Sequence, residues 1–332
     1  MRKIGTHEGR DVLETTLSSG TGVEVSVIGY GAIVRDWQVP VAGALRPVVL
    51  GFERLEDYLA DDAHIGAVAG RVANRIARSR FTLDGRDHVL PANFGPHHLH
   101  GGPKGIGRKV WEMERVPGEE AVKLTLSCPD GEMGYPGRLD ITLIYHLIGH
   151  RLRVEFYAET DAPTPVNIVQ HFYFNLMGGG DVLDHRLQAH ASAYLPVDDD
   201  LIPTGEIRPV DGTPLDLRNG RTLRDEAGQP VVYDSNLVLA TRRDLTSTVA
   251  TVTAPDGSLT LRLWTDQPGL QVYNSGSLKT DRPGLGGRRY PRFGGLCLED
   301  QNFPDAINHA HFPDSIVTPE HPYRHWCEIE IA

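Results

Sequence analysis

Two ionisable side chains lie in segments of this sequence that are otherwise largely apolar. His171 is embedded in the aromatic and aliphatic segment 168–174, and Glu299 directly follows the apolar segment 295–298. Burial disfavours the charged form of such a group and shifts its pKa, which suits a general acid or a general base. A histidine can also be a hydrogen-bonded core residue, and a glutamate can belong to a structural salt bridge. Taken singly, each segment is compatible with either role.

A second polar group interrupts a run of small and apolar residues. The run begins at Ile65 and is broken by Arg71, Asn74 and Arg75. Arginine presents a planar fork of donors that matches a vicinal pair of oxygens, so Asn74 and Arg75 are candidate binders of ligand hydroxyls. Charged residues that protect the exposed edge of a sheet are the alternative interpretation.

A His-x-His pattern, formed by His98 and His100, precedes Gly101 and Gly102. In an extended strand the two imidazoles share one face, and a metal site is then possible. No carboxylate or further ligand accompanies the pair in the sequence, so we predict no metal site from it. The two glycines allow either a close approach to a ligand or a simple turn.

The elements that position these segments are expected to be strands. Apolar and polar residues alternate at 23–28, 121–126, 139–145, 152–157 and 258–264, and Asp84-Gly85 between two β-rich runs predicts a hairpin. Helices are predicted only near 54–59 and 305–309. Glycine and proline are spread evenly and no linker interrupts the chain. We therefore expect one all-β domain over residues 1–332, a large antiparallel sandwich or barrel.

The bulk properties exclude several classes of function. A formal net charge of −11 disfavours binding to nucleic acid or to an anionic membrane, and is compatible with a neutral substrate. No apolar run has the length of a membrane span, and the first residues lack the apolar core of a signal peptide. Three widely spaced cysteines without a Cys-x-x-Cys pattern predict a reduced, cytoplasmic protein without a disulfide framework.

The chain resembles the aldose 1-epimerases, the galactose mutarotase family, from about Gly29 to Tyr323. The segments that carry the resemblance include Gly-Arg-Val-Ala-Asn-Arg-Ile at 70–76, Leu-His-Gly-Gly at 99–102, His-Phe-Tyr-Phe-Asn-Leu at 171–176, Pro-Gly-Leu-Gln-Val-Tyr at 268–273 and Leu-Glu-Asp-Gln-Asn-Phe-Pro-Asp-Ala at 298–306. They occur in the family's order and spacing. The resemblance implies a large antiparallel β-sandwich with a cleft on its concave face.

The same resemblance implies a reaction and a role for each residue. Glu299 matches the general base, His171 the general acid and His100 a second active-site histidine, while sugar hydroxyls are held by Asn74, Arg75, Asp234 and Gln271. The implied reaction opens a free monosaccharide at C1 and recloses it as the other anomer. It transfers no electrons to an acceptor, so neither a cofactor nor a metal is expected. The protein is expected to be a monomer or a homodimer.

Three departures from the family's pattern are expected to lie near the sugar, and they put galactose in doubt as the preferred substrate. Gln170 precedes the acid histidine, Ser235 follows Asp234, and Asn274 follows the tyrosine of 268–273. Other functions stay open at this point. Glu299 and Asp234 could be the two carboxylates of a glycosidase, the chain could be a catalytically silent sugar-binding sandwich, and cations at the cleft mouth would indicate a hexose-phosphate epimerase.

Overall fold

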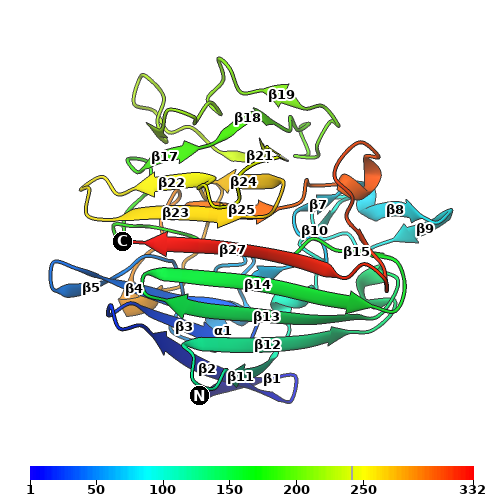
Figure 1. Ribbon diagram of the computed structural model, residues 1–332, viewed down its shortest axis with the longest axis horizontal. Coiled ribbons are helices and arrows are strands. Elements are labelled where there is room, and N and C mark those ends of the chain that lie inside the picture. The colour runs from blue at the N-terminus through cyan, green and yellow to red at the C-terminus, as the bar shows by residue number, and fades with distance from the viewer. Residues whose placement is uncertain (241) are drawn as a thin grey trace.

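The computed structural model describes residues 1–240 and 242–332, and within them the chain is built almost entirely of antiparallel strands (Figure 1). The first sheet has the order β1-β2-β3-β4-β5, with strands at Arg2–His7, Arg10–Ser18, Glu24–Ile28, Ile33–Val41 and Ala44–Pro47. Alternating burial along the central strands β2, β3 and β4 gives the sheet one apolar face, which must be covered.

A nine-stranded sheet provides the cover. Its order is β11-β12-β13-β14-β27-β23-β22-β17-β20, with strands at Glu112–Arg115, Ala121–Cys128, Leu139–Ile148, Arg151–Thr160, Tyr323–Ile331, Thr260–Thr265, Ala250–Thr253, Arg186–Ala189 and Arg221–Thr222. The last strand of the chain, β27, lies in the middle of this nine-stranded sheet. In Figure 1 the blue strands β3 and β4 of the first sheet lie behind the nine-stranded sheet. Val25 and Trp37 of the first sheet join Leu143 and Val154 of the second in one buried core.

The third sheet carries part of the cleft. Its order is β19-β18-β21-β24-β25, with strands at Arg208–Pro209, Ala191–Tyr194, Asp234–Leu239, Gly269–Tyr273 and Cys297–Gln301. Short strand pairs lie beside it: β6 (Val68–Ala69) with β16 (Val169–Gln170), β7 (Arg75–Ile76) with β10 (His98–Leu99), β8 (Arg80–Leu83) with β9 (Arg86–Val89), and β15 (Thr164–Pro165) with β26 (Ile316–Val317). The architecture is the expected all-β antiparallel sandwich.

Helical structure is sparse, as the sequence predicts. The described residues contain one short α-helix, α1 (Leu55–Leu59), and 3-10 turns η1 (Ala77–Ser79), η2 (Ile106–Arg108), η3 (Glu132–Gly134), η4 (Leu285–Gly287) and η5 (Ala306–Asn308). The predicted hairpin forms between β8 and β9, and Asp84 and Gly85 have the positive φ angles, 50° and 74°, that a tight hairpin turn requires. No helix in the described part of the chain is long and apolar enough to cross a bilayer. Cys128, Cys297 and Cys327 are buried and unpaired, as expected.

Candidate active site

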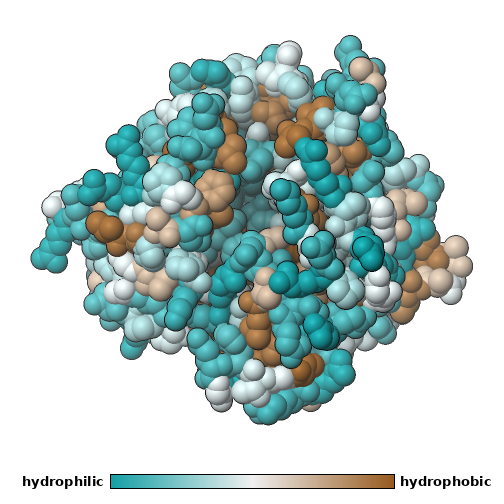
Figure 2. Space-filling view, turned by 180° about the vertical axis from the view of Figure 1, so that it is seen from behind, coloured by the Kyte–Doolittle hydropathy of each residue, from teal (hydrophilic) through white to brown (hydrophobic). Residues whose placement is uncertain are grey.

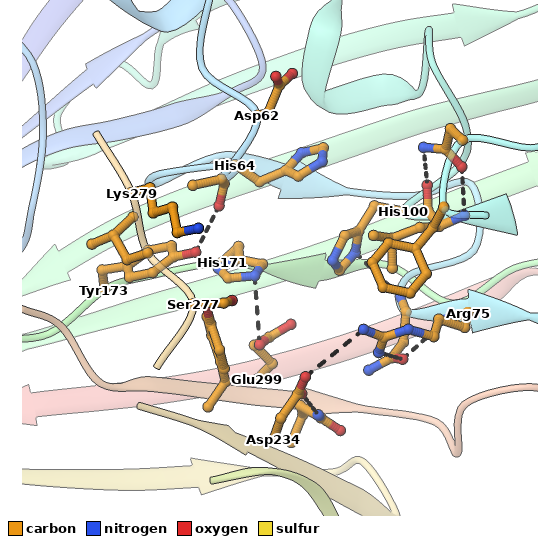
Figure 3. A pocket seen from close by; sticks show the side chains of 18 of the residues that line it. Asp62, His64, Arg75, His100, His171, Tyr173, Asp234, Ser277, Lys279 and Glu299 are labelled. Atoms are coloured by element: carbon orange, nitrogen blue, oxygen red, sulfur yellow. Dashed lines mark hydrogen bonds and ion pairs between the residues drawn. The ribbon is translucent and has the colours of Figure 1, made fainter. Parts of the chain in front are cut away.

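The two residues suited to acid–base chemistry meet at the bottom of an open cavity of about 670 Å³. Glu299 lies on β25, and His171 follows β16, where backbone hydrogen bonds to Gly66 and Ala67 hold it. The His171 Nε2 and Glu299 Oε1 atoms are 3.6 Å apart, and both side chains are buried (Figure 3). The second carboxylate oxygen, Oε2, is buried and has no hydrogen-bond partner within the described residues. The Glu299 side chain lines the cavity, where its carboxyl group can meet a ligand.

Burial decides the charge of this pair. Burial, together with the nearby Asp234 carboxylate and against a smaller opposing effect of Arg75, raises the pKa of Glu299 to about 8. Burial, together with a smaller effect of His64, lowers the pKa of His171 to about 3. In the empty cavity at neutral pH the pair holds one proton, and that proton resides on the carboxyl group rather than on the imidazole.

His100 lies beside His171, with ring centroids 5.4 Å apart. Its Nδ1 accepts a hydrogen bond from the backbone N–H of Asn74 at 3.2 Å. Burial, reinforced by the neighbouring His64 and His171, lowers the pKa of His100 well below its usual value, so the ring is neutral. A neutral ring that accepts at Nδ1 carries its proton on Nε2, so His100 can donate one hydrogen bond to a ligand oxygen.

Asn74 and Arg75 are held by the pairing of β7 with β10 rather than by an exposed sheet edge. Both are buried, which contradicts the sheet-edge interpretation. Asn74 has a left-handed backbone (φ 60°), and its Oδ1 accepts hydrogen bonds from the backbone and guanidinium of Arg75. Its side-chain NH₂ makes no hydrogen bond within the described residues and lies in the cavity lining. Both side chains offer donors to oxygen atoms of a ligand.

Asp234 and Gln271 come from adjacent strands, β21 and β24. Gln271 is the cross-strand partner of Glu299, so strand register alone places its side chain beside the carboxyl group. Its Nε2 donates to Asp234 Oδ1 at 2.6 Å, and Asp234 Oδ2 lies 3.8 Å from Arg75 Nη2. Burial raises the pKa of Asp234, which Arg75 and the Gln271 hydrogen bond partly offset. All seven residues selected from the sequence thus line one cavity.

The expected neighbours of the sugar are placed elsewhere. Gln170, Ser235 and Asn274 do not line the cavity. Gln170 donates to the backbone of Gly66, and Asn274 bonds the backbone of Tyr233 and Val231 across the strand end. Two of the three departures, Gln170 and Asn274, thus use their side chains to bond backbone groups rather than to line the cavity.

The His-x-His pattern is also divided by the fold. His98 is fully buried and bonds Pro91 through Nδ1 and the Tyr135 hydroxyl through Nε2. His100 has a left-handed backbone (φ 51°) rather than an extended one, so the two rings do not share a face. The next residue, Gly101, packs closely against the backbone of Gly70. Any other residue would place a Cβ 1.7 Å from the Gly70 carbonyl oxygen.

Two groups of side chains have atoms close enough to share a metal ion. In one, Cys297 joins His171 and Glu299, but burial raises the pKa of the thiol well above its usual value, so a thiolate ligand is disfavoured. In the other, Cys327 lies beside Asp300 and His325, which bind each other at 2.6 Å. Asp300 also accepts a hydrogen bond from Thr265 at 2.6 Å. The second group is satisfied by its own hydrogen bonds.

Several cavity residues were not selected from the sequence. They include His64, Phe94, Arg108, Tyr173, Tyr273 and Lys279. Tyr173 stacks on His171 with ring centroids 4.9 Å apart, and its place two residues after that histidine was a usable signal. Arg75 lies over the Phe94 ring at 4.6 Å. Phe94, Arg108 and Lys279 come from loops or turns whose positions no local pattern predicts. The space-filling view in Figure 2 shows a hollow near the centre of one face, ringed by hydrophilic residues.

Comparison with known proteins settles the family. The aldose 1-epimerase family model matches residues 14–330. The chain belongs to the aldose 1-epimerase family. It is 40% identical to rat galactose mutarotase over 93% of this chain and 92% of that one, and 34% identical to Escherichia coli aldose 1-epimerase over 97% and 96%.

Solved structures of the family share the fold. An aldose epimerase homologue from C. elegans superposes with a TM-score of 0.91 at 30% identity, covering 97% of this chain and 99% of that one. A galactose 1-epimerase from Lactobacillus acidophilus gives 0.86 at 26% identity, covering 100% and 97%. As a member of the aldose 1-epimerase family the chain is an isomerase, which removes the glycosidase interpretation. Glu299 and His171 are both present and adjacent. The site therefore keeps the two groups whose loss would indicate a catalytically silent sugar-binding protein.

Proposed function

We propose that this chain interconverts the α and β anomers of a free aldose, with Glu299 as the base and His171 as the acid. The observation that carries the proposal is the 3.6 Å approach of the two groups inside a cavity whose wall presents four hydroxyl-binding side chains. An acid and a base at this separation can serve the C1 hydroxyl and the ring oxygen of one sugar at the same time.

Ring opening moves two protons and breaks one bond. Glu299 takes the proton of the C1 hydroxyl, the C1–O5 bond breaks as the C1=O1 double bond forms, and His171 gives its proton to O5. Rotation about C1–C2 presents the other face of the aldehyde. The O5 hydroxyl then attacks C1, His171 recovers its proton, and Glu299 returns its own to O1. The site regains its starting state, and nothing is oxidised or consumed.

The proton on the pair changes place during this cycle. Before ring opening the base must be a carboxylate and the acid an imidazolium, and after it the pair is a carboxylic acid and a neutral imidazole. Burial favours the second arrangement in the empty cavity. A bound sugar favours the first, because its C1 hydroxyl donates to the carboxylate and its ring oxygen accepts from the imidazolium. A bound sugar therefore brings the two arrangements closer together in free energy.

The remaining polar residues orient the sugar. Arg75, Asp234 and Gln271 form one connected group beside Glu299, and together they offer donors and acceptors to adjacent ring hydroxyls. His100 and Asn74 each add a donor. Because the polar groups are pre-arranged by strand pairing, little order has to be imposed when the sugar binds.

Galactose is the first sugar to test. The rat and bovine relatives are named galactose mutarotases, at 40% and 39% identity. None of the three departures that put galactose in doubt lines the cavity, and the side chains of Gln170 and Asn274 bond backbone groups, so they give no reason against it. Anomer exchange should be followed by polarimetry or NMR over a panel of galactose, glucose, xylose and arabinose. No acceleration above the uncatalysed rate with any of them would overturn the proposed reaction.

Aldoses with an anionic group away from C1 are a second candidate class. Arg108 and Lys279 line the cavity, and Lys279 forms no ion pair with a carboxylate of the described residues. Arg108 pairs with the exposed Asp62 at 3.0 Å. If this class is used, galactose 6-phosphate or galacturonate gives a kcat/KM above that of galactose, and Lys279→Gln lowers kcat/KM for the anionic sugar only. Lower values for both anionic sugars would remove this candidate.

A further inference from the structure

One cavity histidine has no part in the acid–base mechanism. His64 lies in the loop between α1 and β6, and its ring reaches the cavity that holds His171 and His100. Figure 3 shows it on the side of His171 that is away from Glu299 and Asp234. The His64 ring centroid is 4.9 Å from that of His100 and 6.4 Å from that of His171, whose ring plane is inclined by 25° to its own.

The loop holds His64 in a conformation that costs free energy. Its φ is 55°, in the left-handed region that residues with a Cβ rarely adopt. The Asp61 carboxylate accepts hydrogen bonds from the backbone N–H groups of Ala63 and Ile65, and the Tyr173 hydroxyl donates to the Ala63 carbonyl at 2.7 Å. The backbone is thus fixed on both sides of the histidine. Strained positions that are fixed in this way cluster at ligand sites.

The His64 ring has unused hydrogen-bonding capacity. Neither ring nitrogen makes a hydrogen bond within the described residues, and neither is sealed off from the cavity. Burial, with a smaller effect of Arg108, lowers the pKa of His64 to about 4, so the ring is neutral at working pH. A neutral imidazole offers one donor and one acceptor, which is the combination that a sugar hydroxyl satisfies.

We propose that His64 is a third substrate-binding histidine, which hydrogen-bonds an aldose hydroxyl out of reach of Arg75, Asp234 and Gln271. The proposal rests on the proposed function, since it needs a sugar in this cavity. Packing alone is the competing explanation, because the ring also fills space against His100. The two differ in their dependence on the sugar. A packing role affects all sugars equally, whereas a hydrogen bond matters only for sugars that carry the hydroxyl.

The test pairs variants of His64 with sugars that lack one hydroxyl each. His64→Phe keeps an aromatic ring and removes both nitrogens, while His64→Asn keeps a donor and an acceptor and tolerates the left-handed backbone. With the parent aldose we expect His64→Phe to lower kcat/KM roughly 3- to 10-fold, the effect of one hydrogen bond to a neutral group. With one monodeoxy sugar of the series the same variant should equal the wild type.

Controls separate this inference from the function on which it rests. Wild-type activity on the parent aldose tests the proposed function, and His190→Phe, at an exposed position outside the cavity lining, controls for the exchange of histidine for phenylalanine. If His64→Phe does not fold, His64→Ala, which also removes both ring nitrogens, carries the same comparison. An equal loss on every monodeoxy sugar, or no loss on the parent aldose, would overturn the assignment of His64.

Discussion

Between about pH 6 and pH 8, kcat/KM for anomer exchange is expected to stay level, and above about pH 8 it is expected to fall. The reason is the single proton that His171 and Glu299 share in the free enzyme. A second proton joins the pair only near the pKa of His171, about 3, and the shared proton leaves only near the pKa of Glu299, about 8. Between these values the pair keeps one proton, as the reaction requires.

The position of that proton follows from the same quantities. The two pKa values differ by about 5 units, so the ion pair is disfavoured by about 7 kcal/mol at 1.36 kcal/mol per unit. Attraction between the charges at 3.6 Å returns about 4–5 kcal/mol at an effective dielectric constant of ~20. The attraction therefore offsets only part of the cost, and the neutral pair stays the major form of the one-proton enzyme before a sugar binds.

The assay is the initial rate of anomer exchange at low sugar concentration, with the hydroxide-catalysed background subtracted at each pH. Asp234→Asn provides a second measurement. The Asp234 charge raises the pKa of Glu299, so its removal should move the alkaline fall to lower pH. A kcat/KM that rises between pH 6 and 8 would refute the reasoning. It would mean that activity requires Glu299 to lose its proton while His171 gains none.

Four further outcomes are expected. Glu299→Gln and His171→Asn should each lower turnover by at least ~100-fold while leaving the circular dichroism spectrum unchanged, and a near-normal rate in either would mean that its role is misassigned. The wild type should lose stability relative to Glu299→Gln as the pH rises from 4.5, the pKa of Glu299 in the unfolded chain, to about 8, its pKa in the folded protein. The difference between their free energies of unfolding should change by roughly 1.4 kcal/mol per pH unit. Over that range the folded wild type keeps a proton that the unfolded chain loses; urea titrations that show a constant difference would contradict this. Gly101→Ala should lower the melting temperature and impair activity, since its Cβ would collide with the Gly70 carbonyl, and an unchanged melting temperature would show that the backbone can move aside. Activity should survive extensive dialysis against EDTA, whereas loss that added Zn²⁺ restores would establish a metal requirement.

Local pattern was enough to predict the strands and their pairing type. Along β12, β13 and β14 buried residues alternate with more exposed ones, and each strand packs its buried face against the core. The turn at Asp84 and Gly85 was predictable because few residues tolerate the left-handed conformations that it needs. The order of strands in the sheets was not predictable from local pattern, since β27, at the end of the chain, lies between β14 and β23. Pairing over such separations depends on the whole core rather than on any one segment.

The sequence by itself determined the family, because the order and spacing of several motifs leave little freedom once they occur together, and it predicted the residues of the acid–base pair. It could not determine which side chains face the sugar. His98 and His100 are two residues apart, yet one bonds Tyr135 and the other lines the cavity, because the backbone of His100 is left-handed. Gln170 adjoins His171 and faces the opposite way. The tertiary structure alone placed His64 beside His171 and set the burial that holds the shared proton on Glu299, since desolvation depends on everything packed around a group.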